Sequence, residues 1–376
     1  MNIDRRSIPD PTKMANRWVA HRTFGPDRIP PVKAIQERKR TERVRISVGM
    51  IADGDPSAIR PAASAITSML MDETPFVDEL VLFRPSTDVP LGRIDARVVA
   101  PDELLREVPA NPGKGDMLWR SLSVLSGDVI VWVEPDARGF DPETILRLTV
   151  PILFHPPIAF VKGYFNAPSE IDLVIDDVSY LAGGTRLTDL LVRPLMNLFF
   201  PELGGFFQPL AASYAGRADC LRKIPFMSGC SAEVAMLIDL LGSLGLDGMA
   251  QVDIETPLNG DRPLDELGPD AHAIARTILK RAAERGRVQL APNLHAHPLL
   301  VPDGDGVDIV RLDEVERPPL ELVPPYLAAL RSDTLSSSRP ASPRKRHATD
   351  NAHVPDDSAR APLRGEWLAD VRGGRS

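Results

Sequence analysis

The stretch DVIVWVE, residues 128–134, is the segment of this 376-residue chain that decides its fold class. It is a continuous apolar, mostly β-branched run that ends at Pro135, which is typical of a strand buried on both faces of a sheet. Similar short runs lie upstream at VRISVGM (44–50), VDELVLF (77–83) and ARVVA (96–100), separated by loops and helical stretches. This alternation predicts an α/β fold with a mostly parallel central sheet.

The second half of the chain is more irregular. Strands are expected at IAFVKGYF (158–165) and MAQVDIE (249–255). Apolar residues at helical spacing predict helices in GGTRLTDLLVRPLMNLFF (183–200) and SAEVAMLIDLLGSLG (231–245), with further helices near 270–285 and 318–331. The second half of the chain is therefore predicted to be mainly helical and to pack against the sheet.

The two ends of the chain differ from the middle. Residues 1–43 mix proline with charge and predict an irregular N-terminal arm that ends in a basic helical turn. Residues 333–376 have almost no large apolar side chains before Leu363, so they cannot offset the entropy of ordering and are expected to form a disordered tail. The folded domain is therefore expected at residues 44–332.

The composition excludes several functional classes. A formal net charge of −8 argues against a nucleic-acid partner. There is no apolar run of about 18 residues that would suit a membrane span, and the N-terminus lacks a secretory signal. The two cysteines, Cys220 and Cys230, are too few for a disulfide framework. We therefore expect a cytoplasmic protein with no membrane partner.

In an open α/β sheet, ligands bind beyond the carboxyl ends of the strands, so the loops after residues 50, 83 and 134 are the places to search. In Glu134-Pro135-Asp136, two carboxylates follow the strongest strand. Such a pair can share Mg²⁺ or Mn²⁺, which would clamp a nucleotide diphosphate. The same pattern also occurs in ordinary strand-to-loop turns, so spacing alone leaves both interpretations open.

Two glycine-containing helix starts are candidate anion sites. Lys114 lies between glycines in PGKG (112–115), where a lysine can meet phosphate, although the spacing is not that of a Walker loop. GGTRLT (183–188) places a guanidinium and a hydroxyl beside exposed backbone N–H groups. A plain helix-start turn and a Thr-capped loop are the structural alternatives. Glu233, taken alone, is interpreted as a first-turn residue whose negative charge interacts favourably with the helix dipole.

Taken together and in order, these segments resemble the actinobacterial glucosyl-3-phosphoglycerate synthases, which are retaining GT-A glycosyltransferases. The similarity spans roughly residues 44–330 and is most specific in NPGKGDMLWRSL, GGTRLTDLLVRPL, QPL…YA (208–215), GLDGMAQV and RPLDELG (262–268). It implies a Rossmann-like nucleotide-sugar-binding fold, with a donor half at 44–140 and an acceptor half at 141–332. The implied reaction moves a sugar, expected to be glucose, from a nucleotide diphosphate sugar such as UDP-glucose to D-3-phosphoglycerate or a related phosphorylated or carboxylated acceptor.

The resemblance also implies roles for individual residues. Glu233 and Asp136 match the catalytic positions, and the donor would contact Ala52, Asp55, Ser86, Lys114 and Glu134. The acceptor would contact Gly184, Arg186 and Thr188. The metal, Mg²⁺ or Mn²⁺, would be held by Asp136, Glu134 and Asn259.

This chain departs from the family pattern mainly in the donor and metal half. Asn259 stands where the family has a metal-binding histidine, and Asp261 is a nearby substitute. Ile51-Ala52-Asp53-Gly54-Asp55 replaces Pro-Ala-x-Asn-Glu, and Cys230 replaces a tyrosine. These changes leave an alternative open, a catalytically silent homologue that binds a ligand or a partner. A different enzyme on the same fold, such as a nucleotidyltransferase, is a third hypothesis. The family also implies a possible homodimer.

Overall fold

The structure is a computed structural model. It describes the residues in the following ranges: 10–52, 56–84, 96–111, 113–134, 140–165, 174–175, 178–179, 186–254, 264–292, 297–324 and 326–328. The expected disordered tail at 333–376 lies outside these residues.

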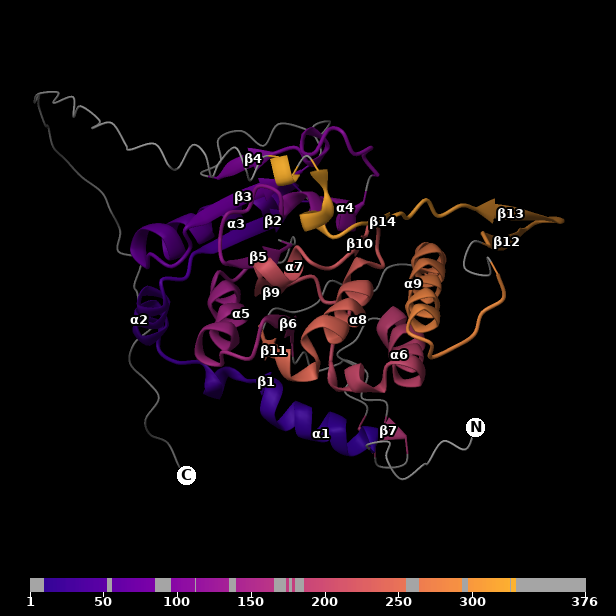
Figure 1. Cartoon of the computed structure of the whole chain (residues 1–376), viewed down its shortest axis with the longest axis horizontal. Helices are drawn as coiled ribbons and strands as arrows, with labels where there is room; N and C mark the ends of the chain where they lie inside the picture. Colours follow the sequence, from indigo (N-terminus) through magenta and orange to yellow (C-terminus); the bar gives the residue numbers. More distant parts are fainter. Residues whose placement is uncertain are drawn as a thin grey trace, which may run out of the picture. The chain divides into compact units, whose positions relative to one another are not determined.

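The centre of the protein is an eight-stranded sheet in the order β1-β11-β6-β9-β5-β2-β3-β4 (Figure 1). All neighbouring strands are parallel except β9, which runs antiparallel to β5 and β6. The mostly parallel sheet is thereby confirmed. Its strands are β1 (Thr23–Phe24), β2 (Ile46–Ile51), β3 (Glu79–Phe83), β4 (Arg97–Val99), β5 (Val129–Val133), β6 (Phe160–Tyr164), β9 (Tyr214–Arg217) and β11 (Met249–Asp253).

Helices cover both faces of this sheet, and alternate residues of each strand point into two separate cores. In β5, Val131 packs in one core and Trp132 in the other. The Val131 core includes side chains of α2 (Val32–Glu42), α3 (Pro56–Ile66) and α5 (Glu143–Phe154). The Trp132 core includes side chains of α4 (Lys114–Ser121), α6 (Arg193–Phe199), α8 (Ala232–Leu244) and α9 (Leu264–Glu284). α3 continues into a π-helical segment, η2 (Thr67–Glu73).

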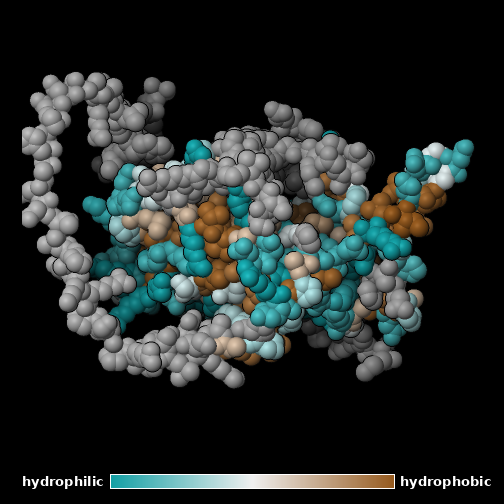
Figure 2. Space-filling view, turned by 90° about the horizontal axis from the view of Figure 1, so that it is seen from above, coloured by the Kyte–Doolittle hydropathy of each residue, from teal (hydrophilic) through white to brown (hydrophobic). Residues whose placement is uncertain are grey.

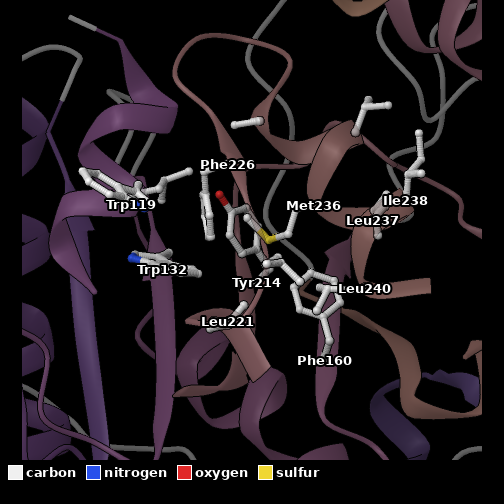
Figure 3. Close-up of a cluster of buried hydrophobic side chains, with 14 of the residues drawn as sticks. Trp119, Trp132, Phe160, Tyr214, Leu221, Phe226, Met236, Leu237, Ile238 and Leu240 are labelled. Atoms are coloured by element: carbon white, nitrogen blue, oxygen red, sulfur yellow. The ribbon is translucent and has the colours of Figure 1, made fainter. Parts of the chain in front are cut away.

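Aromatic side chains fill the middle of the Trp132 core. Tyr214 lies edge-on to Trp132, with ring centroids 5.5 Å apart, and Phe226 is 6.3 Å from Trp132 (Figure 3). Met236 of α8 and Leu221 of α7 (Ala218–Leu221) lie close to Tyr214 in the same view. The antiparallel strand β9 therefore carries the tyrosine on which both halves of the domain pack.

The N-terminal region is more regular than its composition predicts. Where an irregular arm is expected, the structure has α1 (Pro11–Arg22) and β1, and β1 extends the central sheet by pairing with β11. The basic helical turn expected at the end of the arm is the longer helix α2. The Trp18 indole anchors α1, because its Nε1 donates to the carbonyls of Leu246 and Met249 at 3.0 and 3.2 Å. A few apolar contacts thus order a segment that is mostly polar.

The C-terminal described residues return across the domain. β14 (Glu316–Arg317) pairs antiparallel with β10 (Phe226–Met227). The helix expected at 318–331 is wrong as a continuous helix. The structure has the 3-10 turn η8 (Leu320–Leu322) there, followed by helical residues at 324 and 326–328, because prolines at 318, 319, 324 and 325 interrupt helical hydrogen bonding.

A two-stranded hairpin, β12 (Leu299–Asp303) with β13 (Gly306–Val310), extends away from the sheet (Figure 1). Figure 2 shows a hydrophobic surface at this end of the molecule. β7 (Val174–Ile175) and β8 (Val178–Ser179) form another small antiparallel pair. Among the described residues, none of the helices has the length and apolar character that a bilayer crossing demands.

Candidate active site

The carboxyl ends of β2, β3 and β5 lie side by side and form the edge on which the predicted donor loops begin. Ile51 pairs with Phe83, and Met50 pairs with Val133. The buried Ala52 follows β2 and donates its N–H to the Phe83 carbonyl at 2.9 Å, while Glu134 follows β5. Of the other residues expected on this edge, Asp55, Ser86 and Asp136 lie outside the described residues.

At this edge one lysine bridges two carboxylates. Lys114 Nζ lies 2.6 Å from Glu134 Oε1 and 2.5 Å from Glu233 Oε1. The three side chains come from the start of α4, the end of β5 and the first turn of α8. The structure therefore brings together three residues, separated by up to 119 positions in sequence, that were expected to share a site.

The charge of Lys114 is fixed by these neighbours. Burial alone would lower the pKa of Lys114, but attraction to Glu134 and to Glu233 outweighs it and raises the pKa above its usual value. Lys114 therefore stays protonated at physiological pH. It can neutralise negative charge on a ligand, but it cannot serve as a general base.

Close backbone packing places Lys114 next to α8. A Cβ atom on Gly115 would lie 1.9 Å from the Met227 carbonyl oxygen, so only glycine permits this approach. The next residue, Asp116, donates its N–H to the Ser228 carbonyl at 2.9 Å. The glycines that the sequence places around Lys114 thus seat the start of α4 against the segment that leads into α8.

The start of α8 is held by a distant carboxylate. Glu314 accepts hydrogen bonds from the Ser231 backbone N–H at 3.1 Å and from the Ser231 hydroxyl at 2.5 Å. A carboxylate in this place satisfies an otherwise unpaired helix donor and interacts favourably with the helix dipole. Because Glu233 lies two residues further on, Glu314 orients the turn that presents it to Lys114.

A buried charge network holds the other side of α4. Asp116 Oδ2 pairs with Arg120 Nε at 2.7 Å, and Asp116 Oδ1 pairs with Arg317 Nε at 2.6 Å. The Arg120 guanidinium also donates to backbone carbonyls, including that of Val108 at 2.9 Å. Both guanidiniums lie near the Trp119 ring, and the Trp119 indole N–H donates to the Pro318 carbonyl. The returning C-terminal segment therefore fixes the helix that carries Lys114.

Two buried residues beneath this edge were missed as candidates from the sequence. Lys162 of β6 is 2% exposed, and its Nζ lies 4.4 Å from the ring centroid of Tyr214, which faces it across the β6–β9 register. Burial lowers the pKa of Lys162 to about 7, even though attraction to Glu233 acts in the opposite direction. The signal was present, because a lone lysine interrupts the apolar run IAFVKGYF.

Tyr214, the neighbour of Lys162, is the second of these buried residues. Burial raises the pKa of Tyr214 well above its usual value, and the charges of Glu233 and Glu134 add to that effect. Within the described part of the chain, its buried hydroxyl makes no hydrogen bond. An unpaired buried hydroxyl so close to charged groups is uncommon and often marks a functional position.

Of the predicted acceptor residues, Thr188 begins the π-helical segment η4 (Thr188–Val192), which leads into α6, and Arg186 lies just before it. Arg186 is exposed and Thr188 is buried, while Gly184 lies outside the described residues. Leu187, between them, packs in the same core as Met117 of α4. The η4 segment packs against α6 and α9, so the exposed Arg186 guanidinium projects from a turn that these two helices hold.

The chemistry of this edge fits a divalent cation. Glu134 supplies carboxylate oxygens, the donors preferred by Mg²⁺ and Mn²⁺, and its side chain is 30% exposed. The two other predicted ligands, Asp136 and Asn259, are outside the described residues. Across the residues that the structure does describe, no three His, Cys, Asp or Glu side chains gather in a metal-binding group.

Comparisons with known proteins agree with this arrangement. The glucosyl-3-phosphoglycerate synthase of Petrotoga mobilis is 31% identical over 315 residues, which is 82% of this chain and 96% of that protein. The crystal structure of mannosyl-3-phosphoglycerate synthase from Rubrobacter xylanophilus superposes with a TM-score of 0.72 at 28% identity, over 82% of this chain and 99% of that one.

A crystal structure of glucosyl-3-phosphoglycerate synthase from Mycobacterium tuberculosis contains Mn²⁺, UDP-glucose and phosphoglyceric acid. It matches with a TM-score of 0.63 at 30% identity, over 78% of this chain and 95% of that one. No protein-family model matches the sequence. The extent of these matches, together with the expected GT-A architecture, shows that the chain belongs to the glucosyl-3-phosphoglycerate synthase family of glycosyltransferases.

Proposed function

We propose that this protein transfers glucose from UDP-glucose to D-3-phosphoglycerate with retention of configuration at the anomeric carbon. The observation that carries the proposal is the Lys114–Glu134–Glu233 cluster at the carboxyl edge of the sheet. A permanently charged lysine at that edge is suited to a diphosphate leaving group, and the relatives' substrates support the choice of donor and acceptor.

Each residue has a distinct part in this proposal. Lys114 neutralises charge that develops on the diphosphate as the anomeric C–O bond breaks. Glu233 orients hydroxyl groups of the sugar or acceptor, and Arg186 with Thr188 binds the phosphorylated acceptor through its guanidinium and hydroxyl. Much of the rate acceleration would then come from positioning the two substrates.

A divalent cation completes the donor site in this proposal. Glu134, together with Asp136 and Asn259, would hold Mn²⁺ or Mg²⁺, and the ion would add positive charge beside the diphosphate. Because both substrates carry phosphate and do not cross membranes unaided, we propose that the reaction takes place in the cytoplasm.

The proposal predicts opposite kinetic signatures for the donor and acceptor residues. Lys114→Met should lower kcat roughly 100-fold, because it removes charge stabilisation of the leaving group, whereas Lys114→Arg should retain part of the activity. Arg186→Ala should mainly raise the KM for D-3-phosphoglycerate. The measurement is UDP release with Mn²⁺, varying one substrate at a time, and equal effects of both variants on both substrates would contradict these roles.

The same assay tests the donor sugar and the alternative of a silent homologue. The similarity to the mannosyl-3-phosphoglycerate synthase structure makes mannose the natural second sugar, and GDP-mannose is the donor with which we would test it. Faster turnover with GDP-mannose than with UDP-glucose would replace glucose by mannose in the proposal. No turnover with either donor, and no metal-dependent nucleotide binding by calorimetry, would favour the silent homologue.

A further inference from the structure

A hollow of about 910 Å³ lies beside α1, at the edge of the sheet opposite the Lys114 cluster. Its wall includes Leu246 and Asp247, which precede the amino end of β11, and His155, which precedes β6. Lys114, Glu134 and Glu233 are not among its lining residues. The volume is in the range of small-molecule sites, and the location separates this hollow from the transfer site.

Positive charge dominates the lining. Lys13, Arg17, Arg22 and Arg28 are permanently charged, and His21 and His155 add two titratable rings. Only two carboxylates, Asp10 and Asp247, oppose them. Burial lowers the pKa of His155, and the charges of Arg28 and Arg22 lower it further, which reflects the positive field in the hollow.

Most of this charge is not neutralised within the protein. In the residues that the structure describes, the side chains of Lys13, Arg17 and His21 make no hydrogen bond or ion pair. Asp10 caps α1 through the Thr12 N–H, and Asp247 is 3.7 Å from Arg22 with its own side chain 95% exposed. The Arg22 Nε is also buried without a partner. A buried donor of this kind often marks the place of an unseen ligand.

The basic residues of α1 are placed where they destabilise the helix. Lys13, Arg17 and His21 are spaced four residues apart, so they lie along one face of α1, which has no acidic residue. Cations four residues apart destabilise a helix. The helix dipole favours His21 and Arg22 in the last turn, but it disfavours Lys13 in the first. The stability of α1 therefore does not explain why these basic side chains lie along one face of the helix.

We propose that the hollow beside α1 is a second binding site, which takes a small polyanion of the diphosphate or phosphate-ester class. Arginine and lysine side chains converging from α1 and the β1–η1 segment can surround several phosphate oxygens at once. The site is independent of the transfer reaction, because it shares no lining residue with the Lys114 cluster.

The test uses inorganic pyrophosphate and the full chain in metal-free buffer. Isothermal titration calorimetry should detect two pyrophosphate sites, one in the hollow and one at the transfer site. Lys13→Gln combined with Arg17→Gln should weaken one of them at least tenfold and leave the other unchanged. Both side chains are exposed and unpaired, so this variant should fold normally, which circular dichroism and UDP affinity would check.

A matched control separates a local site from general charge. Arg106→Gln with Arg311→Gln removes the same net charge from two exposed positions outside the hollow, and it should leave both affinities unchanged. Hydrogen exchange of residues 11–22 should slow when pyrophosphate is added to the wild type, but not to the Lys13/Arg17 variant. Equal pyrophosphate binding by the two double variants, or unchanged exchange in α1, would overturn the proposal.

Discussion

Lys162 is a lysine held inside the protein at a cost to stability. Its pKa falls from 10.5 to about 7, because burial disfavours the charged form. Between these two values the unfolded chain binds the proton more strongly than the folded protein does. Stability therefore rises as the pH increases from about 7 towards 10.5, and below about 7 this group adds no further pH dependence.

Replacing this residue should remove that dependence. In metal-free protein, Lys162→Met should raise the free energy of unfolding at pH 7 by a few kcal/mol, and its advantage over the wild type should shrink as the pH rises to 10. Urea denaturation at several pH values measures this difference. Lys33→Met, at an exposed position, is the control and should track the wild type throughout. Parallel curves for wild type and Lys162→Met would show that the lysine is not held in this way.

At the scale of elements, α4 is the part of the structure on which the site depends most. Gly115→Ala would push a methyl group against the Met227 carbonyl, so the start of α4 must move away from α8. We expect kcat to fall at least tenfold, because Lys114 moves with the helix and small displacements in an active site are costly. Gly268→Ala, with nothing within 4 Å of its added Cβ, is the matched control in another helix and should leave kcat unchanged.

The anchoring of α4 makes a separate prediction for stability. Asp116→Ala would leave the buried guanidiniums of Arg120 and Arg317 without their shared carboxylate. Loss of one partner from a buried charge network should reduce the free energy of unfolding by about 3–5 kcal/mol. Thermal and urea denaturation would measure it, with Glu103→Ala at an exposed position as the control. A loss below 1 kcal/mol would mean that the network is not a structural anchor.

How much could be predicted from the sequence also differs between elements. The apolar runs at 44–50, 77–83, 128–134 and 158–165 all correspond to strands. Strands that are buried on both faces are recognisable because their sequences are almost continuously apolar. α1 was missed and α2 was expected only as a short basic helical turn, since only Trp18 and Ile35 are buried in them and most of their other residues are polar. In the site, the spacing around Lys114 was informative, but the contacts of Glu314 and Arg317 depend on tertiary folding that no local motif encodes.

At the scale of the whole molecule, the β12–β13 hairpin carries an apolar surface. Leu300 and Ile309 are cross-strand partners that are 58% and 59% exposed, and Val307, on the same face, is 58% exposed. A contiguous apolar face of this kind is typical of a protein–protein contact. We expect a second copy of the chain to cover it, which would account for the possible homodimer.

Analytical ultracentrifugation tests this expectation. Leu300→Asp with Ile309→Asp should convert a dimer to a monomer, because two charges would be buried in the contact. Val301→Asp, on the opposite face of the same hairpin, is the control and should leave the mass unchanged. A wild-type protein that sediments as a monomer at micromolar concentrations would contradict the assignment.

The return of residues 313–318 across α4 and α8 limits how far the protein can be shortened. A fragment ending at residue 292 would keep every amino acid expected to touch substrate, yet it would lack both Glu314 and Arg317. Its helices would still be encoded, but the contacts of Glu314 with α8 and of Arg317 with α4, which help to hold the lysine of one helix opposite the glutamate of the other, would be lost. We therefore expect catalytic competence only once β14 (Glu316–Arg317) has been synthesised and paired with β10.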